Sequence, residues 1–237
     1  MYMSEYRYWF TLKGYRVISQ SQALERRLWD IFPQRCLTFW PYLLSDRTGI
    51  KDFLERDIPV TVDTKMDGLG HFTTRIDWLT AWVKVEWRGH LWCISNDGKM
   101  WLYERGRKND DSTGRLVWKI PDEGNAQDGA TLQTPMTGVF RSPIDTGVIA
   151  SFLDEFRGYE WFSEASEITW ERRAGMDLFI LRVLHGTQRI EIYIQREKYS
   201  GQDVGAQIDI LFARLINEGG NHVIDATYEG KILLRNL

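Results

Sequence analysis

The sequence predicts two α+β domains, in the second of which helices pack on an antiparallel sheet. Three features of the 237-residue chain favour this class. Segments that alternate with period two are interleaved with helical segments, glycine-containing turns separate neighbouring strands, and the chain closes with a helix followed by two strand-like runs. A composition of 43% hydrophobic and 27% charged residues is that of a folded globular protein.

The first domain is predicted to span residues 1–88 with the element order β-α-α-β-β. Ser21 is placed to cap its first helix, and Pro33 ends that helix because proline cannot continue the hydrogen-bonded ladder. The predicted elements are a strand over 6–13 closed by Gly14, a helix over 21–31, a helical region over 40–56 broken near Thr48-Gly49, a strand over 58–66, and one or two strands over 72–88.

The second domain is predicted to span residues 89–237. Asn96-Asp97-Gly98 between two apolar runs is a strong hairpin signal, and Ser142-Pro143 is placed to open a helix. Residues 105–142 show little regular pattern and read mainly as loops. The predicted elements are strands over 91–95 and 99–103, a helix over 142–157, strands over 168–171, 178–184 and 189–195, a helix over 203–218, and strands over 222–228 and 231–237.

The helix near the C-terminus has one apolar face, which is expected to lie on the sheet. Its members recur at the spacing of a single helix stripe: Val204, Ile208, Leu211, Phe212 and Leu215. The Glu229-Gly230 pair that separates the two closing strands can supply the positive φ of a tight turn.

The sequence offers no catalytic, cofactor-binding or metal-binding pattern, and we expect no enzyme activity and no cofactor. Its four histidines are scattered, and no nucleophile elbow, phosphate loop, dinucleotide fingerprint or zinc motif occurs. A net charge of −3 gives no footprint for nucleic acid. Cys36 and Cys93 are either one disulfide or two buried thiols, the second being favoured.

No run approaches the ~20 apolar residues that span a bilayer, and the opening Met1-Tyr-Met-Ser-Glu lacks the apolar core of a signal peptide. Two interpretations remain: a cytoplasmic protein, or the extracytoplasmic part of a protein whose membrane anchor lies outside this sequence.

Tryptophan is abundant, and nine of the eleven tryptophans precede residue 120. If strands exposed Trp78, Trp82, Trp87 and Trp101 in a row, their indoles could stack on sugar rings. A glycan-binding module of the cell envelope is therefore the alternative function. Burial of these side chains in the core is the simpler interpretation, and their exposure separates the two.

Three segments carry a resemblance to the extracytoplasmic region of the bacterial cell-division protein family FtsQ, also called DivIB. Val83-Lys-Val-Glu-Trp-Arg88, followed by an apolar run and Asp97-Gly98, is similar to the end of that family's POTRA domain. Glu171-Arg172-Arg173 precedes a strand pair, as in family members. Ile224-Asp-Ala-Thr-Tyr-Glu-Gly230 resembles the closing segment of the family, with Thr227 in place of an arginine.

The resemblance implies a POTRA-like domain over 1–88 and a β-domain over 89–237. It implies a non-enzymatic divisome scaffold that acts in septum formation, anchored in the membrane by an N-terminal helix. Its partners would be FtsB-like and FtsL-like proteins, bound by addition of a strand to an unpaired edge. The residues implied in partner binding are Tyr228, Gly230, Lys231, Ile232, Leu233, Leu234, Arg235, Arg172 and Arg173.

Overall fold

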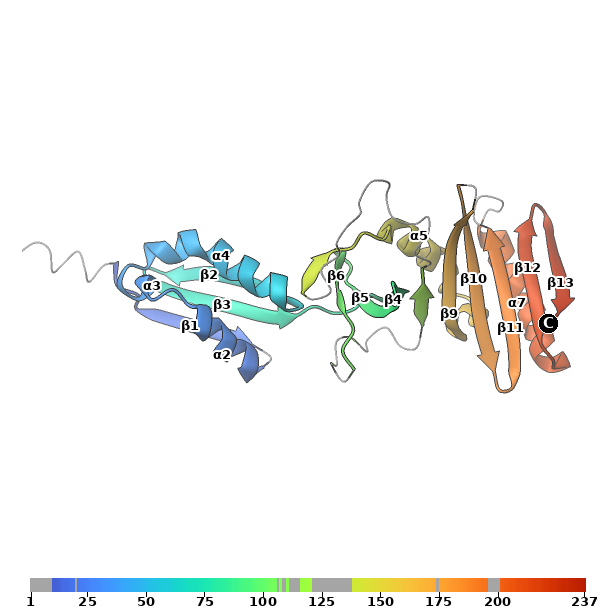
Figure 1. The fold of residues 1–237 in the computed structure, drawn as a ribbon, viewed down its shortest axis with the longest axis horizontal. Coiled ribbons are helices and arrows are strands. Elements are labelled where there is room, and N and C mark those ends of the chain that lie inside the picture. The colour runs from blue at the N-terminus through green and yellow to red at the C-terminus, as the bar shows by residue number, and fades with distance from the viewer. Residues whose placement is uncertain are drawn as a thin grey trace, which may run out of the picture. The chain divides into compact units, whose positions relative to one another are not determined.

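A computed structural model of the chain describes residues 10–19, 21–105, 107, 110, 116–120, 138–173, 175–195 and 201–237 (Figure 1). It has two compact units, one formed by Met1–Thr80 with Pro135–Phe140 and the other by Ala81–Thr134 with Arg141–Leu237. The α+β class is confirmed. The boundary between the units follows Thr80, whereas the sequence placed it after residue 88.

The first unit packs helices on one face of a three-stranded sheet. Its sheet has the order β1-β3-β2, in which β1 and β3 are parallel while β2 and β3 are antiparallel. The elements are β1 (Gly14–Ser19), α2 (Gln22–Ile31), α3 (Arg35–Thr38), α4 (Pro41–Asp57), β2 (Val60–Gly68) and β3 (His71–Trp78). Buried side chains from the helices and the sheet form one core, among them Leu28, Leu43, Leu54, Val60 and Ile76.

Three predictions for this unit need correction. The predicted strand over 6–13 is not a strand at its described residues 10–13, and residues 6–9 lie outside the described residues. The first described strand is Gly14–Ser19. Gly14 continues the chain into a strand instead of ending one, because its N–H pairs with the carbonyl of Gly70 at 3.2 Å. Helix α4 passes through Gly49 without interruption, since a single glycine only lowers helix stability.

The third correction concerns the segment that was expected to close the first unit. Val83–Trp87 forms β4, which pairs with β5 (His90–Ile94) in the sheet of the second unit. The alternating pattern of this strand was recognised from the sequence, but a pattern does not say which neighbour a strand pairs with.

The second unit is built on a long mixed sheet with helices on one face (Figure 1). Its strands lie side by side in the order β13-β12-β11-β10-β9-β7-β4-β5-β6. The remaining elements are β6 (Lys99–Leu102), β7 (Val117–Lys119), β8 (Val139–Arg141, at the boundary between the units), α5 (Thr146–Phe156), α6 (Glu160–Ser163), β9 (Ala165–Arg173), β10 (Met176–His185), β11 (Gln188–Gln195), α7 (Gly201–Glu218), β12 (His222–Tyr228) and β13 (Lys231–Asn236).

The prediction of an antiparallel sheet was wrong in part. The strand pairs β4–β7, β7–β9 and β11–β12 are parallel. Strand β7 lies within the stretch interpreted as loops and brings Trp118, which is fully buried, into the sheet. A strand of three residues is too short for its alternation to be recognised in a sequence.

The cap of helix α5 also differs from the prediction. Asp145 is the N-cap, and its carboxylate accepts the N–H of Gly147 at 3.0 Å. The Ser142 hydroxyl instead accepts the N–H of Ile144 at 3.1 Å, one turn before the helix. Both residues are good caps, and the chain geometry selects the later one.

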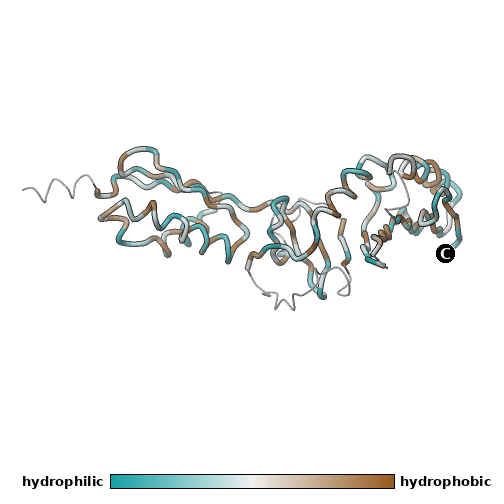
Figure 2. Tube along the Cα trace, turned by 90° about the horizontal axis from the view of Figure 1, so that it is seen from above, coloured by the Kyte–Doolittle hydropathy of each residue, from teal (hydrophilic) through white to brown (hydrophobic). Residues whose placement is uncertain are grey.

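Helix α7 covers the sheet beside β12, as the sequence predicted. Of the five stripe residues, Val204, Ile208, Phe212 and Leu215 are buried and Leu211 is half-buried. The opposing sheet face carries buried isoleucines of β11 and β12. Hydrophobic and hydrophilic positions accordingly alternate along the chain in both units (Figure 2).

The two cysteines are free thiols and both are buried, so the disulfide alternative is not realised. Burial, together with the nearby Asp46 carboxylate, raises the pKa of the Cys36 thiol to about 11. None of the helices within the described residues is long and apolar enough to cross a membrane.

Candidate partner-binding surface

The chain closes with the predicted hairpin of β12 and β13. Tyr228 pairs with Lys231 across a two-residue turn, Glu229-Gly230. Gly230 adopts φ +66°, a conformation that side chains with a Cβ disfavour, which is why glycine is needed there. No atom lies within 4 Å of where its Cβ would be, so the constraint comes from the backbone and not from crowding.

Strand β13 is the outermost strand at this end of the sheet. Among the described strands it pairs with β12 alone. Leu237 donates its N–H to the carbonyl of Asn221 at 3.0 Å, which identifies the hydrogen-bonded positions of the ladder. Antiparallel residues alternate between inward-bonded and outward-facing backbone groups. The positions whose N–H and C=O face outward are therefore Ile232, Leu234 and Asn236.

The side chains of β13 are exposed on both faces of the sheet. Leu233 and Leu234 point to opposite faces and are 40% and 44% exposed, respectively, and Ile232 is half-buried. Tyr228, the last residue of β12, and Leu237, directly after β13, are also exposed. An apolar edge strand with outward backbone groups can accept an added strand, whose side chains would cover these leucines.

Asp225 stabilises the hairpin through contacts with both of its strands. It accepts hydrogen bonds from the N–H and hydroxyl of Thr227, at 3.1 and 2.6 Å, where the register of the strand pair shifts. Its other carboxylate oxygen forms an ion pair with Arg235. Arg235, which the resemblance implies in partner binding, therefore also stabilises its own hairpin. The stabilising role of Asp225 was missed, because sequence spacing does not show which side chains meet across strands.

The arginines of the second predicted site do not lie beside the hairpin. Arg172 is on β9, and the strands β10, β11 and β12 separate it from β13. Its guanidinium contacts Asp177 of the neighbouring β10 at 3.2 Å. The backbone of Arg173 pairs with Met176, and its side chain lies outside the described residues. The structure thus brings together Tyr228 to Arg235 and leaves Arg172 engaged elsewhere.

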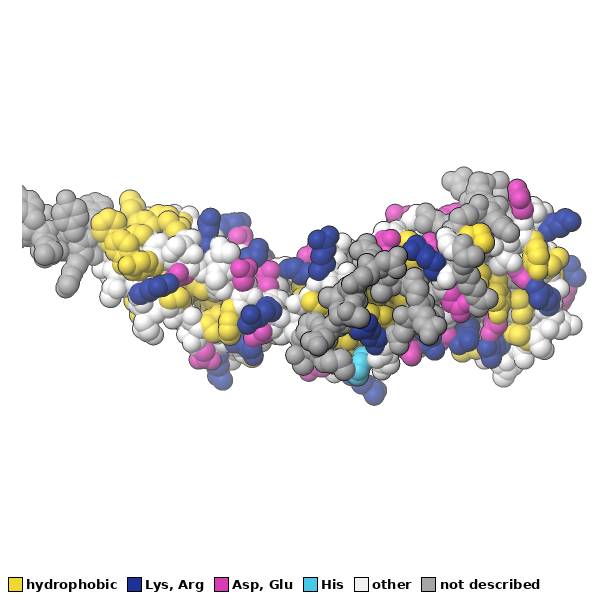
Figure 3. Space-filling view, turned by 45° about the horizontal axis from the view of Figure 1, so that its top comes forward, with side chains coloured by type: hydrophobic (Ala, Val, Ile, Leu, Met, Phe, Trp, Pro, Cys, Tyr) yellow, Lys and Arg dark blue, Asp and Glu magenta, His cyan; other side chains and the backbone are white. Residues whose placement is uncertain are grey.

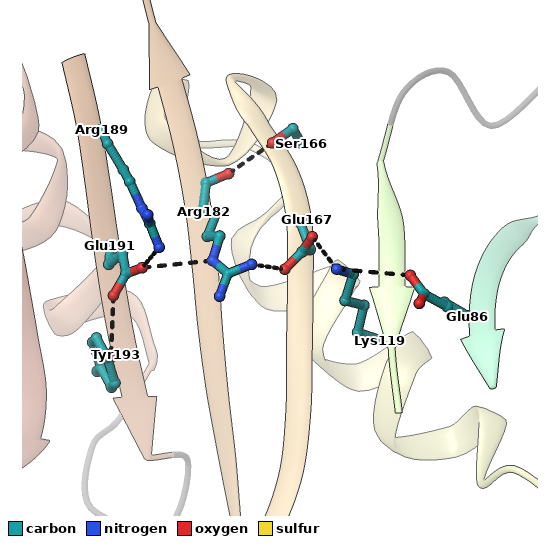
Figure 4. Close-up of polar contacts among 8 residues, drawn as sticks. All are labelled: Glu86, Lys119, Ser166, Glu167, Arg182, Arg189, Glu191 and Tyr193. Atoms are coloured by element: carbon teal, nitrogen blue, oxygen red, sulfur yellow. Dashed lines mark hydrogen bonds and ion pairs between the residues drawn. The ribbon is translucent and has the colours of Figure 1, made fainter. Parts of the chain in front are cut away.

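The sheet face opposite the helices carries alternating charges that pair with one another (Figure 4). Glu191 contacts Arg189 and Arg182, and Arg182 contacts Glu167 at 2.6 Å. Lys119 then bridges Glu167 at 2.7 Å and Glu86 at 3.7 Å. Because each charge already has an opposite neighbour, this face offers little uncompensated charge to a ligand.

Glu191 is the most buried carboxylate of this network. Burial acts to raise the pKa of its carboxyl group, but hydrogen bonds from Arg189 and Tyr193 and the charges of Arg189 and Arg182 outweigh burial and hold the pKa below its usual value. The carboxylate therefore stays ionised and keeps β10 and β11 linked on their polar face.

The tryptophans of the glycan-binding alternative do not form an exposed row. Trp87 and Trp101 are 5% and 1% exposed, and the Trp101 indole donates to the buried Asp110 carboxylate at 3.0 Å. Trp78 and Trp82 are half-buried. Stacking on sugar rings requires open indole faces, so these four side chains do not supply that platform.

Within the described residues, no group of histidine, cysteine and acidic side chains is arranged to hold a metal ion. No family model and no curated protein matches the chain.

Proposed function

We propose that this protein is a non-enzymatic scaffold of the FtsQ/DivIB type, which binds its partners by accepting a β-strand at the outer edge of β13. The partners would be an FtsB-like protein that supplies the strand and an FtsL-like protein associated with it. The proposal places the chain outside the cytoplasmic membrane during septum formation, anchored by a helix that precedes this sequence.

The single observation that carries the proposal is the open apolar edge of β13. Leu233 and Leu234 are exposed on opposite faces, and the backbone groups of alternate residues face outward. An added strand would satisfy those groups and bury apolar surface on both faces. Because each leucine is already more than half buried, its further burial contributes about 1 kcal/mol before the cost of ordering the partner.

Two further observations support the family assignment. The first unit has the strand-helix-helix-strand-strand order expected of a POTRA-like domain, with the short α3 added between its two longer helices. The motif residues Asp225, Tyr228 and Gly230 all lie in the hairpin that carries the open edge.

The decisive experiment measures binding of the chain to a soluble extracytoplasmic FtsB–FtsL complex from the same organism. Leu234→Pro removes an outward N–H and leaves the bonds to β12 in place. We expect it to weaken binding by at least about 100-fold while circular dichroism and thermal unfolding stay close to wild type, since several backbone bonds and their register are lost together. Tyr228→Ala should weaken binding by about tenfold through loss of an apolar contact.

Two controls make this test specific. Leu234→Ser keeps the backbone N–H and should weaken binding far less than Leu234→Pro. Arg172→Ala should leave binding unchanged. Arg172 forms an ion pair with Asp177, and the strands β10, β11 and β12 lie between its own strand β9 and the edge strand β13. If the wild type binds the complex and Leu234→Pro binds equally well, strand addition at β13 is wrong. If the wild type does not bind, the assignment of partner is wrong.

A further inference from the structure

The first unit exposes a cluster of large apolar side chains where its described chain begins. We call this cluster the apolar tip; it consists of Phe10, Leu37, Phe39, Tyr42 and Leu69. Figure 3 shows hydrophobic side chains gathered at this end of the first unit. Leu69 is 56% exposed, Tyr42 44%, Leu37 41% and Phe39 37%. An exposed apolar cluster of this kind marks an interaction surface.

Three chain segments converge to build the apolar tip. The N–H of Leu12 bonds to the carbonyl of Leu37 at 3.2 Å, and the N–H of Trp40 bonds to the carbonyl of Phe10 at 2.7 Å. The N–H of Lys13 bonds to the carbonyl of Gly70, next to Leu69 in the β2–β3 turn, at 2.8 Å. These bonds hold the three segments together.

The aromatic rings of the apolar tip also touch one another. The ring of Phe39 lies 5.1 Å from that of Phe10 and 5.0 Å from that of Tyr42, measured between centroids. The guanidinium of Arg35 lies 5.2 Å from the Tyr42 ring centroid, and Asp46 balances its charge. The aromatic members of the cluster thus form a contiguous surface, and the charge of the adjacent Arg35 is paired.

We propose that the apolar tip rests on the surface of a phospholipid bilayer, with Leu69 and Phe39 entering the boundary between headgroups and acyl chains. The backbone groups that join its segments are already hydrogen-bonded, and a surface that enters lipid must not carry unpaired backbone groups. Leu69 stands at the tip of a hairpin, where an apolar side chain can enter the boundary alone. Aromatic side chains with a polar end, such as Tyr42, favour this boundary.

The chain that leads into the apolar tip has a matching composition. Residues 1–9 directly precede Phe10 and are rich in the aromatic types that concentrate at membrane interfaces: Tyr2, Tyr6, Tyr8 and Trp9. The bilayer contact is a separate proposal from strand addition, because the apolar tip and β13 belong to different units.

The test is flotation of the full chain with vesicles of phosphatidylcholine and phosphatidylglycerol. The full chain is expected to float with the vesicles, and the bound fraction should persist in high salt because apolar contact is the main attraction. Leu69→Ser should lower the vesicle partition coefficient at least about threefold, and Phe39→Ser/Leu69→Ser at least about tenfold. Ile210→Ser is the matched control, since Ile210 is 72% exposed on α7 and should not alter partition.

Several results would overturn the proposal. If the chain does not float, or if Leu69→Ser floats as well as wild type, the apolar tip does not bind a bilayer. If the chain dimerises without lipid and Leu69→Ser dissociates the dimer, a second copy covers the cluster instead. If removal of residues 1–9 strengthens vesicle binding, the chain's own N-terminal segment is the usual occupant.

Discussion

Strands β2 and β13 both lie at the edge of a sheet, yet they differ in how their outward backbone groups are covered. At the β2 edge, the carboxylate of Glu55, on helix α4, accepts the N–H of Val62 at 2.9 Å. Asp63 and Lys65 are exposed along the same strand and form an ion pair at 3.0 Å. At β13, no described strand or helix covers the outward backbone groups, and leucines lie exposed on both faces.

The difference supports the proposal that the outer edge of β13 accepts a partner strand. An uncovered edge strand is a liability for association and aggregation, and proteins usually block it with charges or side-chain caps. This chain supplies such a block at β2, in its smaller unit. Strand β13 carries exposed charges at Lys231 and Arg235, and Arg235 is paired with Asp225. Within the described residues, however, no side-chain carboxylate caps the N–H of Ile232 or Leu234 as Glu55 caps that of Val62.

Strand β12 holds β13 in place, and β12 itself packs against helix α7. Phe212→Ala removes a ring that is 1% exposed and should lower the free energy of unfolding of the second unit by about 3–5 kcal/mol. Urea denaturation measures this loss. Leu211→Ala should cost less because Leu211 is only half-buried, and Ile210→Ala should change stability by less than about 0.5 kcal/mol. Equal losses at Phe212 and Ile210 would mean that α7 is not docked.

A pH titration examines β11, the strand that supports β12. The folded pKa of Glu191 lies below its unfolded value of about 4.3, so its contribution to stability is full above that value and is lost as pH falls through the folded pKa. Glu191→Gln should cost about 1–2 kcal/mol at neutral pH. Its deficit relative to wild type should shrink as pH falls below the unfolded value and through the folded pKa. If the stability deficit of Glu191→Gln does not depend on pH, the loss comes from altered packing and not from the missing charge.

Opening the protected edge is the converse experiment. Glu55→Ala leaves the N–H of Val62 without its carboxylate acceptor, which should lower the stability of the first unit by about 1–2 kcal/mol. It should also promote association, detectable by sedimentation, because β2 then presents an uncapped edge. Asp52→Ala, at an exposed position of the same helix, is the control and should alter neither property. If Asp52→Ala has the same effect, general charge rather than capping protects β2.

The smallest effect concerns the turn that orients the open edge. Gly230→Ala forces a side chain into φ +66° and should cost about 1 kcal/mol in thermal or urea unfolding. Gly49→Ala, in helix α4 and also with open space around its Cβ, should raise stability by about 0.5–1 kcal/mol. Effects of the same sign at both glycines would contradict the backbone explanation.

Local signals in the sequence identified most of the long elements. The stripe of α7, the Asp97-Gly98 turn and the Glu229-Gly230 turn each predict an element that the structure contains. The elements that were missed or misplaced, such as β7 and the N-cap of α5, are short or have two equivalent candidates. In such places the local pattern carries too little information to select one conformation.

The sequence by itself determined the α+β class, the amphipathic helix α7 and the terminal hairpin, because each depends on periodicity or on a residue suited to a turn. Only the tertiary structure decided which strands are neighbours. In that structure Val83–Trp87 belongs to the second sheet, Arg235 pairs with Asp225, and Trp87 and Trp101 are buried. The structure also left β13 at an edge while Glu55 capped β2. These outcomes depend on contacts between residues far apart in the chain, which no local spacing records.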